Sequence, residues 1–382
     1  MKGSLQIKGQ QYYAVFRVNG NKTPTWFPLG IEPKRGNKRQ AERAMAELVA
    51  KYQKNPNEFN KIDFVEYIKK WLIEVKPQID IITFDGYKQY VEKHIIPYFE
   101  EKHLMLQDIS IKDIEGYYNF KSVGGRLDGK PGGLSTRTIK LHSVVLSLVF
   151  KKAIYNGLLN KNPCDYAQLP NTKKKKPIAK FYTQEQCKKL LNIINGTPLY
   201  DMVYITTIYG LRRSELVGLK WSAVDFVDNT ISIQHTVVVS SVVVEKDKTK
   251  TQSSARLYPL LPDVKKILLN IKKEQQKYRN VFGNSYVESD YVFTKQDGKR
   301  YYPEYPSKTL QKQLKQHNLP HIRFHDLRHT AASLLLVKGW SMKDISDWLG
   351  HSNIGITMNT YSHIDLAHKR EMSNMLNGVF DN

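Results

Sequence analysis

Residues 321–363 read HIRFHDLRHTAASLLLVKGWSMKDISDWLGHSNIGITMNTYSH, and their spacing predicts two helices with marked ends. The first helix has an apolar stripe at helical spacing, formed by Leu327, Ala331, Leu334 and Leu335. Gly339 follows this helix as the expected residue after its C-cap. Ser341 and Asp344 make a capping-box pattern that begins a second helix, which Gly350 ends.

Four side chains able to act on a phosphate or a proton lie at the ends of these elements: His325, Arg328, His351 and Tyr361. A helix would place His325 and Arg328 on one face, because they are three residues apart. Taken singly each is ordinary, since a His-x-x-Arg pair is usually a surface pair and the chain contains 23 tyrosines. The order HDLRHT, then LGH, then TYSH, with two capped helices between them, indicates a shared site.

This order resembles the signature of the tyrosine recombinase, or phage integrase, family, which has His-x-x-Arg, then Leu-Gly-His, then a nucleophilic Tyr. The family also has an arginine and a lysine upstream, and both are present here. YGLRRSELVGLKW (209–221) resembles its Gly-Leu-Arg-x-x-Glu-Leu box and identifies Arg212, not Arg213, as the catalytic arginine. Without the resemblance, Arg212 and Glu215 would be read as an ordinary i,i+3 ion pair.

The lysine lies in KTKTQSSARLYPL (248–260), a polar turn that leads into a strand. The family's β-hairpin pattern matches Lys250, Thr251, Ser254 and Arg256. The distance to Arg256 favours Lys250 over Lys248, which stays the alternative one register away.

The resemblance implies how these residues would exchange DNA strands. Tyr361 attacks the scissile phosphate and forms a 3′-phosphotyrosyl link. Arg212 and Arg328 bind its non-bridging oxygens with the forked geometry that lysine lacks, and His351 donates a further hydrogen bond to them.

Two proton transfers complete the reaction that the resemblance implies. His325 helps to remove the tyrosine proton, and Lys250 protonates the departing 5′-hydroxyl. The expected enzyme needs no metal, nucleotide or other cofactor, because the phosphotyrosine preserves the bond energy for rejoining.

Composition agrees with a protein that acts on a polyanion. The chain has 382 residues, which suits two or three domains, and a formal charge of +23 with a pI near 9.6. Its apolar runs are shorter than the roughly 20 residues of a membrane span, and MKGSLQIKGQ is not a signal peptide. Cys164 and Cys187 give neither a disulfide framework nor a zinc pattern. We therefore expect a cytoplasmic protein without a membrane partner.

Residues 1–57 are expected to form a small β-sheet-plus-helix domain. Strands are predicted at Tyr12–Val18 and Thr25–Leu29, joined through Asn19-Gly20, and a helix at Lys38–Tyr52. Eleven Lys and Arg residues stand against three Glu residues, which gives a charge of +8. The domain resembles the arm-type DNA-binding domain of phage and conjugative-transposon integrases.

The rest of the chain is expected to form two larger domains. Residues 60–170 read as helices with a glycine-rich loop at 124–133, and resemble the family's helical core-binding (SAM-like) domain. The basic run at 171–180 is the predicted linker. Residues 181–382 are predicted to be the α+β catalytic domain, mostly helical with one small antiparallel sheet.

The function expected from the resemblance is that of an integrase, a site-specific recombinase that moves an element into and out of DNA. Its expected partners are double-stranded DNA at core and arm sites and three further copies of itself in a tetramer. A need for an excisionase or a DNA-bending host protein is left open. A resolvase-like (Xer-type) recombinase and a type IB topoisomerase are the alternatives with the same chemistry.

Two alternatives from other classes fit less of the sequence. A metal phosphohydrolase would use residues whose spacing matches no ligand pattern: His325, Asp326, His329, His351 and His363. A DNA-binding regulator would explain the charge but not the six ordered residues.

Overall fold

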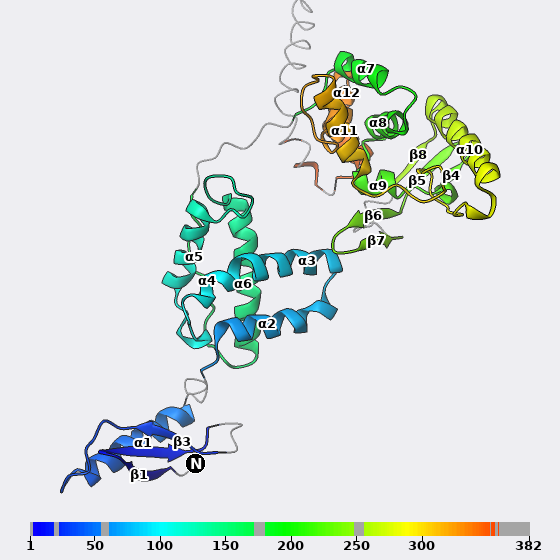
Figure 1. Cartoon of the computed structure of the whole chain (residues 1–382). Coiled ribbons are helices and arrows are strands. Elements are labelled where there is room, and N and C mark those ends of the chain that lie inside the picture. Colours follow the sequence, from blue (N-terminus) through cyan, green and yellow to red (C-terminus); the bar gives the residue numbers. More distant parts are fainter. Residues whose placement is uncertain are drawn as a thin grey trace, which may run out of the picture. The chain divides into compact units, whose positions relative to one another are not determined.

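The computed structural model shows a multidomain protein that is mostly helical and contains small antiparallel sheets (Figure 1). It separates into two compact units, Met1–Lys174 and Lys175–Asn382, and each is described by itself. The structure describes residues 3–18, 23–54, 61–171, 180–247, 256–351, 353–355 and 358.

The first unit begins with a three-stranded antiparallel sheet and a helix. Their bounds are β1 Ser4–Lys8, β2 Gln11–Phe16, β3 Thr25–Pro28 and α1 Lys38–Lys54. Alternate residues of β2, Ala14 and Phe16, pack against Val49 and Tyr52 of α1, as period-two alternation requires. The sequence predicted β2, β3 and α1 but missed β1, and the predicted Asn19-Gly20 turn lies outside the described residues.

The remainder of the first unit is helical. Its elements are α2 Phe64–Val75, η2 Lys76–Gln78, α3 Ile81–Tyr90, η3 Val91–Ile95, α4 Ile96–Glu100, η4 Leu106–Asp108, α5 Ile111–Gly124 and α6 Thr136–Tyr155. The spacing of Ser110 and Asp113 in the sequence predicts a capping box, and the structure has it at the start of α5. Phe64 stacks on Phe150 at 5.5 Å between ring centroids, which joins the first helix to the last through the core.

The second unit carries two small sheets among its helices. The helical elements are α7 Gln184–Ile193, α8 Pro198–Tyr209, α9 Arg213–Val217, η5 Trp221–Ala223, α10 Pro262–Phe282, η7 Gly283–Ser285, α11 Tyr305–Gln316, α12 Asp326–Val337 and α13 Met342–Leu349. The strands are β4 Val224–Asp225, β5 Thr230–Ile233, β6 Thr236–Val239, β7 Val243–Lys246 and β8 Arg256–Pro259.

The prediction of one sheet in this unit was wrong. β5 pairs with β4 and β8, whereas the valine strands β6 and β7 pair only with each other within the described residues. The valine strands β6 and β7 therefore form a separate ribbon, and β8 is the strand that pairs with β5 on the side away from β4. This brings Arg256, the first residue of β8, next to Ile233.

The two predicted helices near the C-terminus are confirmed as α12 and α13. Gly339 follows α12 with a positive φ of 86°, and the Ser341 side chain accepts a hydrogen bond from the Asp344 N–H. Gly350 ends α13 in the left-handed conformation. Leu327 and Ala331 are buried, but Leu334 and Leu335 are only half-buried, because Ala332 and Leu336 share the contact face.

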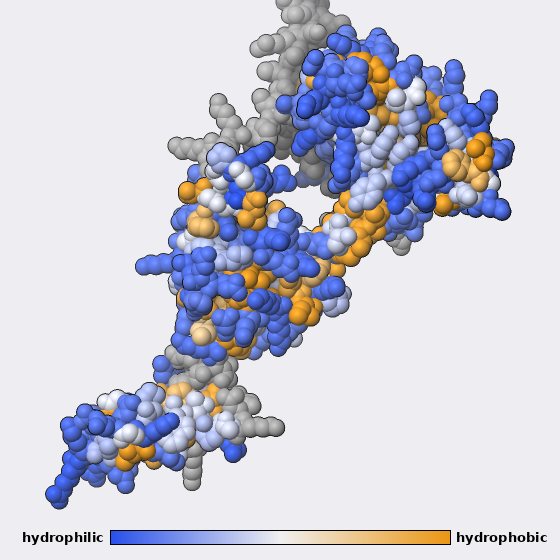
Figure 2. All heavy atoms as spheres, in the orientation of Figure 1, coloured by the Kyte–Doolittle hydropathy of each residue, from blue (hydrophilic) through white to orange (hydrophobic). Residues whose placement is uncertain are grey.

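Hydrophilic side chains cover most of the visible surface, as a chain of this charge requires (Figure 2). Apolar atoms reach the surface along the β6–β7 ribbon, where Val242 and Val243 are exposed (Figure 2). Within the described residues, no helix combines the length and the apolar character needed to cross a membrane.

Candidate active site

The turn between α8 and α9 presents Arg212. Gly210 ends α8 with φ +62°, and a Cβ at this position would lie 2.1 Å from Cδ2 of Leu349. The glycine is therefore needed for its conformation and for close packing on α13. Arg212 then becomes the N-cap of α9, and its side chain keeps 36% of its surface exposed.

Glu215 lies beneath Arg212 and is 1% exposed. Its Oε1 accepts from the Arg212 guanidinium at 2.6 Å, and its Oε2 accepts from the Arg212 backbone N–H at 2.8 Å. The same Oε2 accepts from Arg256 at 2.5 Å. Burial by itself would raise the pKa of Glu215, but Arg256 and Arg212 outweigh it and lower the pKa below its usual value. Glu215 is thus a buried carboxylate anchor rather than one half of a surface pair.

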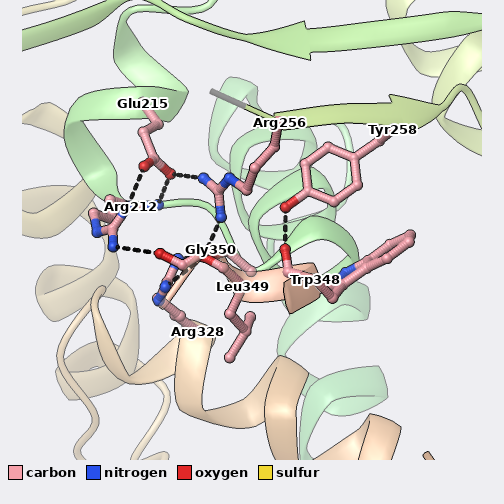
Figure 3. A network of polar contacts seen from close by, with 9 residues as sticks. Arg212, Glu215, Arg256, Tyr258, Arg328, Trp348, Leu349 and Gly350 are labelled. Carbon is pink, nitrogen blue, oxygen red and sulfur yellow. Dashed lines mark hydrogen bonds and ion pairs between the residues drawn. The ribbon is translucent and has the colours of Figure 1, made fainter. Parts of the chain in front are cut away.

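The carboxyl end of α13 is where these side chains meet (Figure 3). Consecutive carbonyls of Trp348, Leu349 and Gly350 accept hydrogen bonds from four side chains: Tyr258, Arg256, Arg328 and Arg212. A helix end carries partial negative charge on its unpaired carbonyls, so it stabilises guanidinium groups.

Arg328 is 2% exposed, and two main-chain oxygens accept hydrogen bonds from its terminal nitrogens. It donates to the Gly210 carbonyl at 2.7 Å and to the Leu349 carbonyl at 2.6 Å. Burial, and then the neighbouring Arg212, lower the pKa of Arg328 to about 9, so it stays charged at neutral pH. Three guanidinium groups and one carboxylate, Glu215, lie together here, and Arg212 and Arg256 bond that carboxylate (Figure 3). The cluster therefore has an excess of positive charge suited to an anion.

His351 follows Gly350 directly and is fixed by the helix end. Its backbone N–H donates to the Ser346 carbonyl at 2.9 Å, which completes the turn that stops α13. Burial, followed by Arg328 and Arg212, lowers the pKa of His351 to about 3. The imidazole is therefore neutral at pH 7 and has one N–H to donate.

His325 is the N-cap of α12 and its side chain is exposed, although Arg328 in the same turn is buried. Its ring lies edge-on to His329, with 5.4 Å between centroids. Partial burial of the ring and the nearby His329 lower the pKa of His325. A neutral imidazole at neutral pH can accept a proton.

The structure thus brings together Arg212, Arg328 and His351, and sets His325 one turn before Arg328. The other two predicted residues, Lys250 and Tyr361, lie outside the described residues, as do Lys248 and His363.

Sequence reasoning missed the contacts of two side chains on β8. Arg256 reaches Glu215 and Leu349, and Tyr258 reaches the Trp348 carbonyl. The family's hairpin pattern includes Arg256, so the sequence singles out this residue. The pattern places the lysine but does not predict which residues Arg256 contacts.

A metal ligand set does not form here among the described residues. Asp326 is 2% exposed, and both of its carboxylate oxygens accept hydrogen bonds from Arg323. Across the part of the chain that the structure describes, no group of three or more His, Cys, Asp or Glu side chains is arranged to hold a metal ion.

Comparison with known proteins identifies the family. The sequence profile of the phage integrase family matches residues 180–368, and that of the N-terminal SAM-like domain of phage integrases matches residues 63–122. A XerC-like tyrosine recombinase of Caldanaerobacter subterraneus subsp. tengcongensis is 30% identical over 366 residues, which cover 90% of each chain. The chain belongs to the phage integrase family of tyrosine recombinases. It is a site-specific recombinase.

Two further proteins resemble the recombinase. The ICEBs1 integrase of Bacillus subtilis is 27% identical, over 82% of this chain and 81% of its own. The Tn1549 transposon integrase (residues 82–397), solved in complex with circular intermediate DNA, is 23% identical with a TM-score of 0.64. The match covers 82% of this chain and 100% of that one, and it establishes the fold.

Proposed function

We propose that this recombinase is an integrase that inserts a mobile element into DNA and excises it, through a 3′-phosphotyrosyl intermediate. The observation that carries the chemistry is the convergence of Arg212 and Arg328 on the α13 carboxyl end beside His351. The assignment to a mobile element rests on the similarity to the ICEBs1 integrase.

The phosphate would sit against the exposed edge of Arg212. Arg212 and Arg328 would neutralise the two non-bridging oxygens as charge develops on them, and His351 would add a neutral N–H donor. Their existing bonds to carbonyls and to Glu215 fix the side chains before DNA arrives, so little reorganisation accompanies the reaction.

The remaining steps use a nucleophile and two proton carriers. Tyr361 would attack the phosphate, with neutral His325 helping to accept its proton. Lys250 would give a proton to the departing 5′-hydroxyl. The 5′-hydroxyl of a second duplex would then reverse the reaction and exchange the strands.

We assign DNA-binding roles to the parts of the chain as follows. Residues 1–57 would bind a distal arm site, and residues 60–170 would clamp the core site. Residues 171–180 would link these two parts to the catalytic residues 181–382. Four copies on two duplexes would be needed, because each copy cleaves one strand, and the reaction would take place in the bacterial cytoplasm.

The test of this function is a covalent adduct with DNA in the presence of EDTA. Direct repeats that flank the gene give the crossover sequence, which is placed in a duplex with a nick beside the cleavage position. A recombinase traps itself on such DNA, whereas a DNA-binding regulator leaves no adduct and a metal phosphohydrolase is stopped by EDTA. Absence of an adduct on every flanking repeat would contradict the function.

Lys250→Ala is expected to slow cleavage by about 10²–10⁴-fold, the usual contribution of a general acid. A substrate with sulfur at the 5′-bridging position should restore the rate, because a thiolate leaves without a proton. Lys248→Ala is the matched control and should cleave ordinary DNA normally. Sulfur rescue of Lys248→Ala instead would move the assignment to Lys248.

A chain that begins at residue 58 is expected to cleave core-site DNA but to lose arm-site protection and most integration. The basis is the +8 charge of residues 1–57 and the gain in effective concentration that tethering gives, commonly about 10²-fold or more. Footprinting and a recombination assay measure the two activities, and arm-site binding should weaken steeply with salt. Integration as good as that of the full chain would favour the Xer-type alternative, which the similarity to a XerC-like enzyme raises.

A further inference from the structure

Arg256 has no role in the reaction described above, yet it is buried in the middle of the site. It begins β8 and is 8% exposed. Its guanidinium donates to Glu215 at 2.5 Å and to the Leu349 carbonyl, and it lies 5.6 Å from the centre of the Tyr258 ring (Figure 3). The two hydrogen bonds join β8 to segments that lie 41 and 93 positions away in the sequence.

Both groups that Arg256 holds also support a phosphate-binding arginine. Glu215 receives two hydrogen bonds from Arg212, one from the side chain and one from the backbone. The Leu349 carbonyl receives a second hydrogen bond from Arg328. Arg256 therefore ties the support of Arg212 to the support of Arg328.

Arg256 also packs on the turn that presents His351. Gly350 has φ +64°, and a Cβ there would lie 2.7 Å from Cδ of Arg256. The side chain thus fills the space that the glycine leaves open, and its hydrogen bond to Leu349 fixes the carbonyl just before that turn. Loss of Arg256 would remove the β8 contact nearest this turn and leave Tyr258, which bonds the Trp348 carbonyl, as the β8 side chain that holds this end of α13.

The charges around Glu215 predict how Arg212 would move if Arg256 were lost. Glu215 is buried, and Arg256 and Arg212 together hold its pKa below the usual value despite that burial. Without Arg256, the whole carboxylate would be left to Arg212, which would be drawn towards it and away from an incoming phosphate.

We propose that Arg256 is a positioning residue for strand cleavage: it holds Arg212 and the His351 turn in register with the phosphate without contacting DNA. The proposal rests on the proposed function, since it needs a phosphate to be activated at this site. Arg256 is more buried than Arg212, whose side chain is partly exposed, and the salt dependence of DNA binding tests whether Arg256 contacts a phosphate.

The experiment compares Arg256→Met and Arg256→Lys of the full chain with Arg300→Met as the matched control. Arg300 is a partly buried arginine of the same unit with a side chain 15% exposed, and its guanidinium donates to Glu245 and to the Tyr301 carbonyl rather than to α13. Single-turnover cleavage of the nicked duplex gives a rate constant, and the final adduct yield gives the fraction of active protein. Salt titration of DNA binding counts the phosphate contacts.

Arg256→Met should lower the rate constant by about 30–100-fold, less than removal of a direct oxyanion donor, with unchanged yield and salt slope. Arg256→Lys should fall in between, because lysine keeps the charge but cannot fork between Glu215 and Leu349. Arg300→Met should cleave like the unaltered recombinase. Should Arg256→Met fail to fold, the rate constant of Arg256→Lys decides the matter.

Three outcomes would overturn the proposal. A rate constant within about threefold of normal would mean that the anchor is dispensable. A reduced yield at a normal rate would indicate a role in folding alone. A salt slope smaller by about one would mean that Arg256 itself binds a phosphate. If the unaltered recombinase forms no adduct, the proposed function fails and not this inference alone.

Discussion

Tyr361→Phe is expected to bind core-site DNA with normal affinity and to form no covalent adduct. The change removes one oxygen, the atom that would bond to phosphorus, and keeps the aromatic ring. Because the phenol is consumed as a nucleophile, no partial activity should persist, unlike the loss of a stabilising group. The measurement is adduct yield on the nicked duplex after denaturing electrophoresis, with binding followed in parallel by mobility shift.

A matched control for this prediction is Tyr302→Phe, since Tyr302 is half-exposed in the same unit. Within the described residues its hydroxyl makes no hydrogen bond to the arginine cluster, Arg212, Arg256 and Arg328. It should give the normal yield. An adduct that survives in Tyr361→Phe and maps to another tyrosine would disprove the assignment.

Arg212→Ala and Arg328→Ala are each expected to slow cleavage by about 10²–10³-fold, or about 3–4 kcal/mol, by analogy with the loss of one donor to a developing oxyanion. Arg212 is the cleaner case, because its side chain is partly exposed and its removal leaves Glu215 paired with Arg256. Single-turnover rate constants at saturating DNA measure the effect.

Arg328→Ala will also weaken the fold, because it leaves the Gly210 carbonyl without its donor and empties a buried site. Thermal unfolding and adduct yield separate this loss from the loss of rate. Arg213→Ala is the control for both, since Arg213 points to Ser307 and away from the cluster. Cleavage near the normal rate by either alanine variant would mean that the phosphate binds elsewhere.

Local features of the sequence predicted most helices but not the contacts between them. The caps at Ser110, Ser341 and Gly350 depend on a few neighbouring residues, and all three were predicted. Strand β1 was missed because SLQIK is short and mostly exposed, so it lacks a clear apolar alternation. The π-helical turn at Val91–Ile95 was also missed, since it interrupts a stripe that otherwise reads as continuous α-helix.

The residues of the arginine cluster could be predicted from the sequence, but the contacts among them could not. Motif spacing selected Arg212, Arg328 and His351, and the structure gathers them at one helix end. The bond from Arg256 to Glu215 joins residues 41 positions apart, and it depends on β8 pairing with β5. No pattern within one segment carries that information.

The meeting of these segments at the end of α13 governs when the enzyme becomes active during its synthesis. A ribosome makes the unit Met1–Lys174 before the unit that holds the arginine cluster, and domains generally fold in that order. Arg212 and Arg256 have no partner carbonyls on α13 until Leu349 and Gly350 have emerged, and Gly350 comes 138 positions after Arg212. A nascent chain that has not reached Gly350 therefore lacks the assembled arginine cluster, and with it the site at which we propose that DNA is cut.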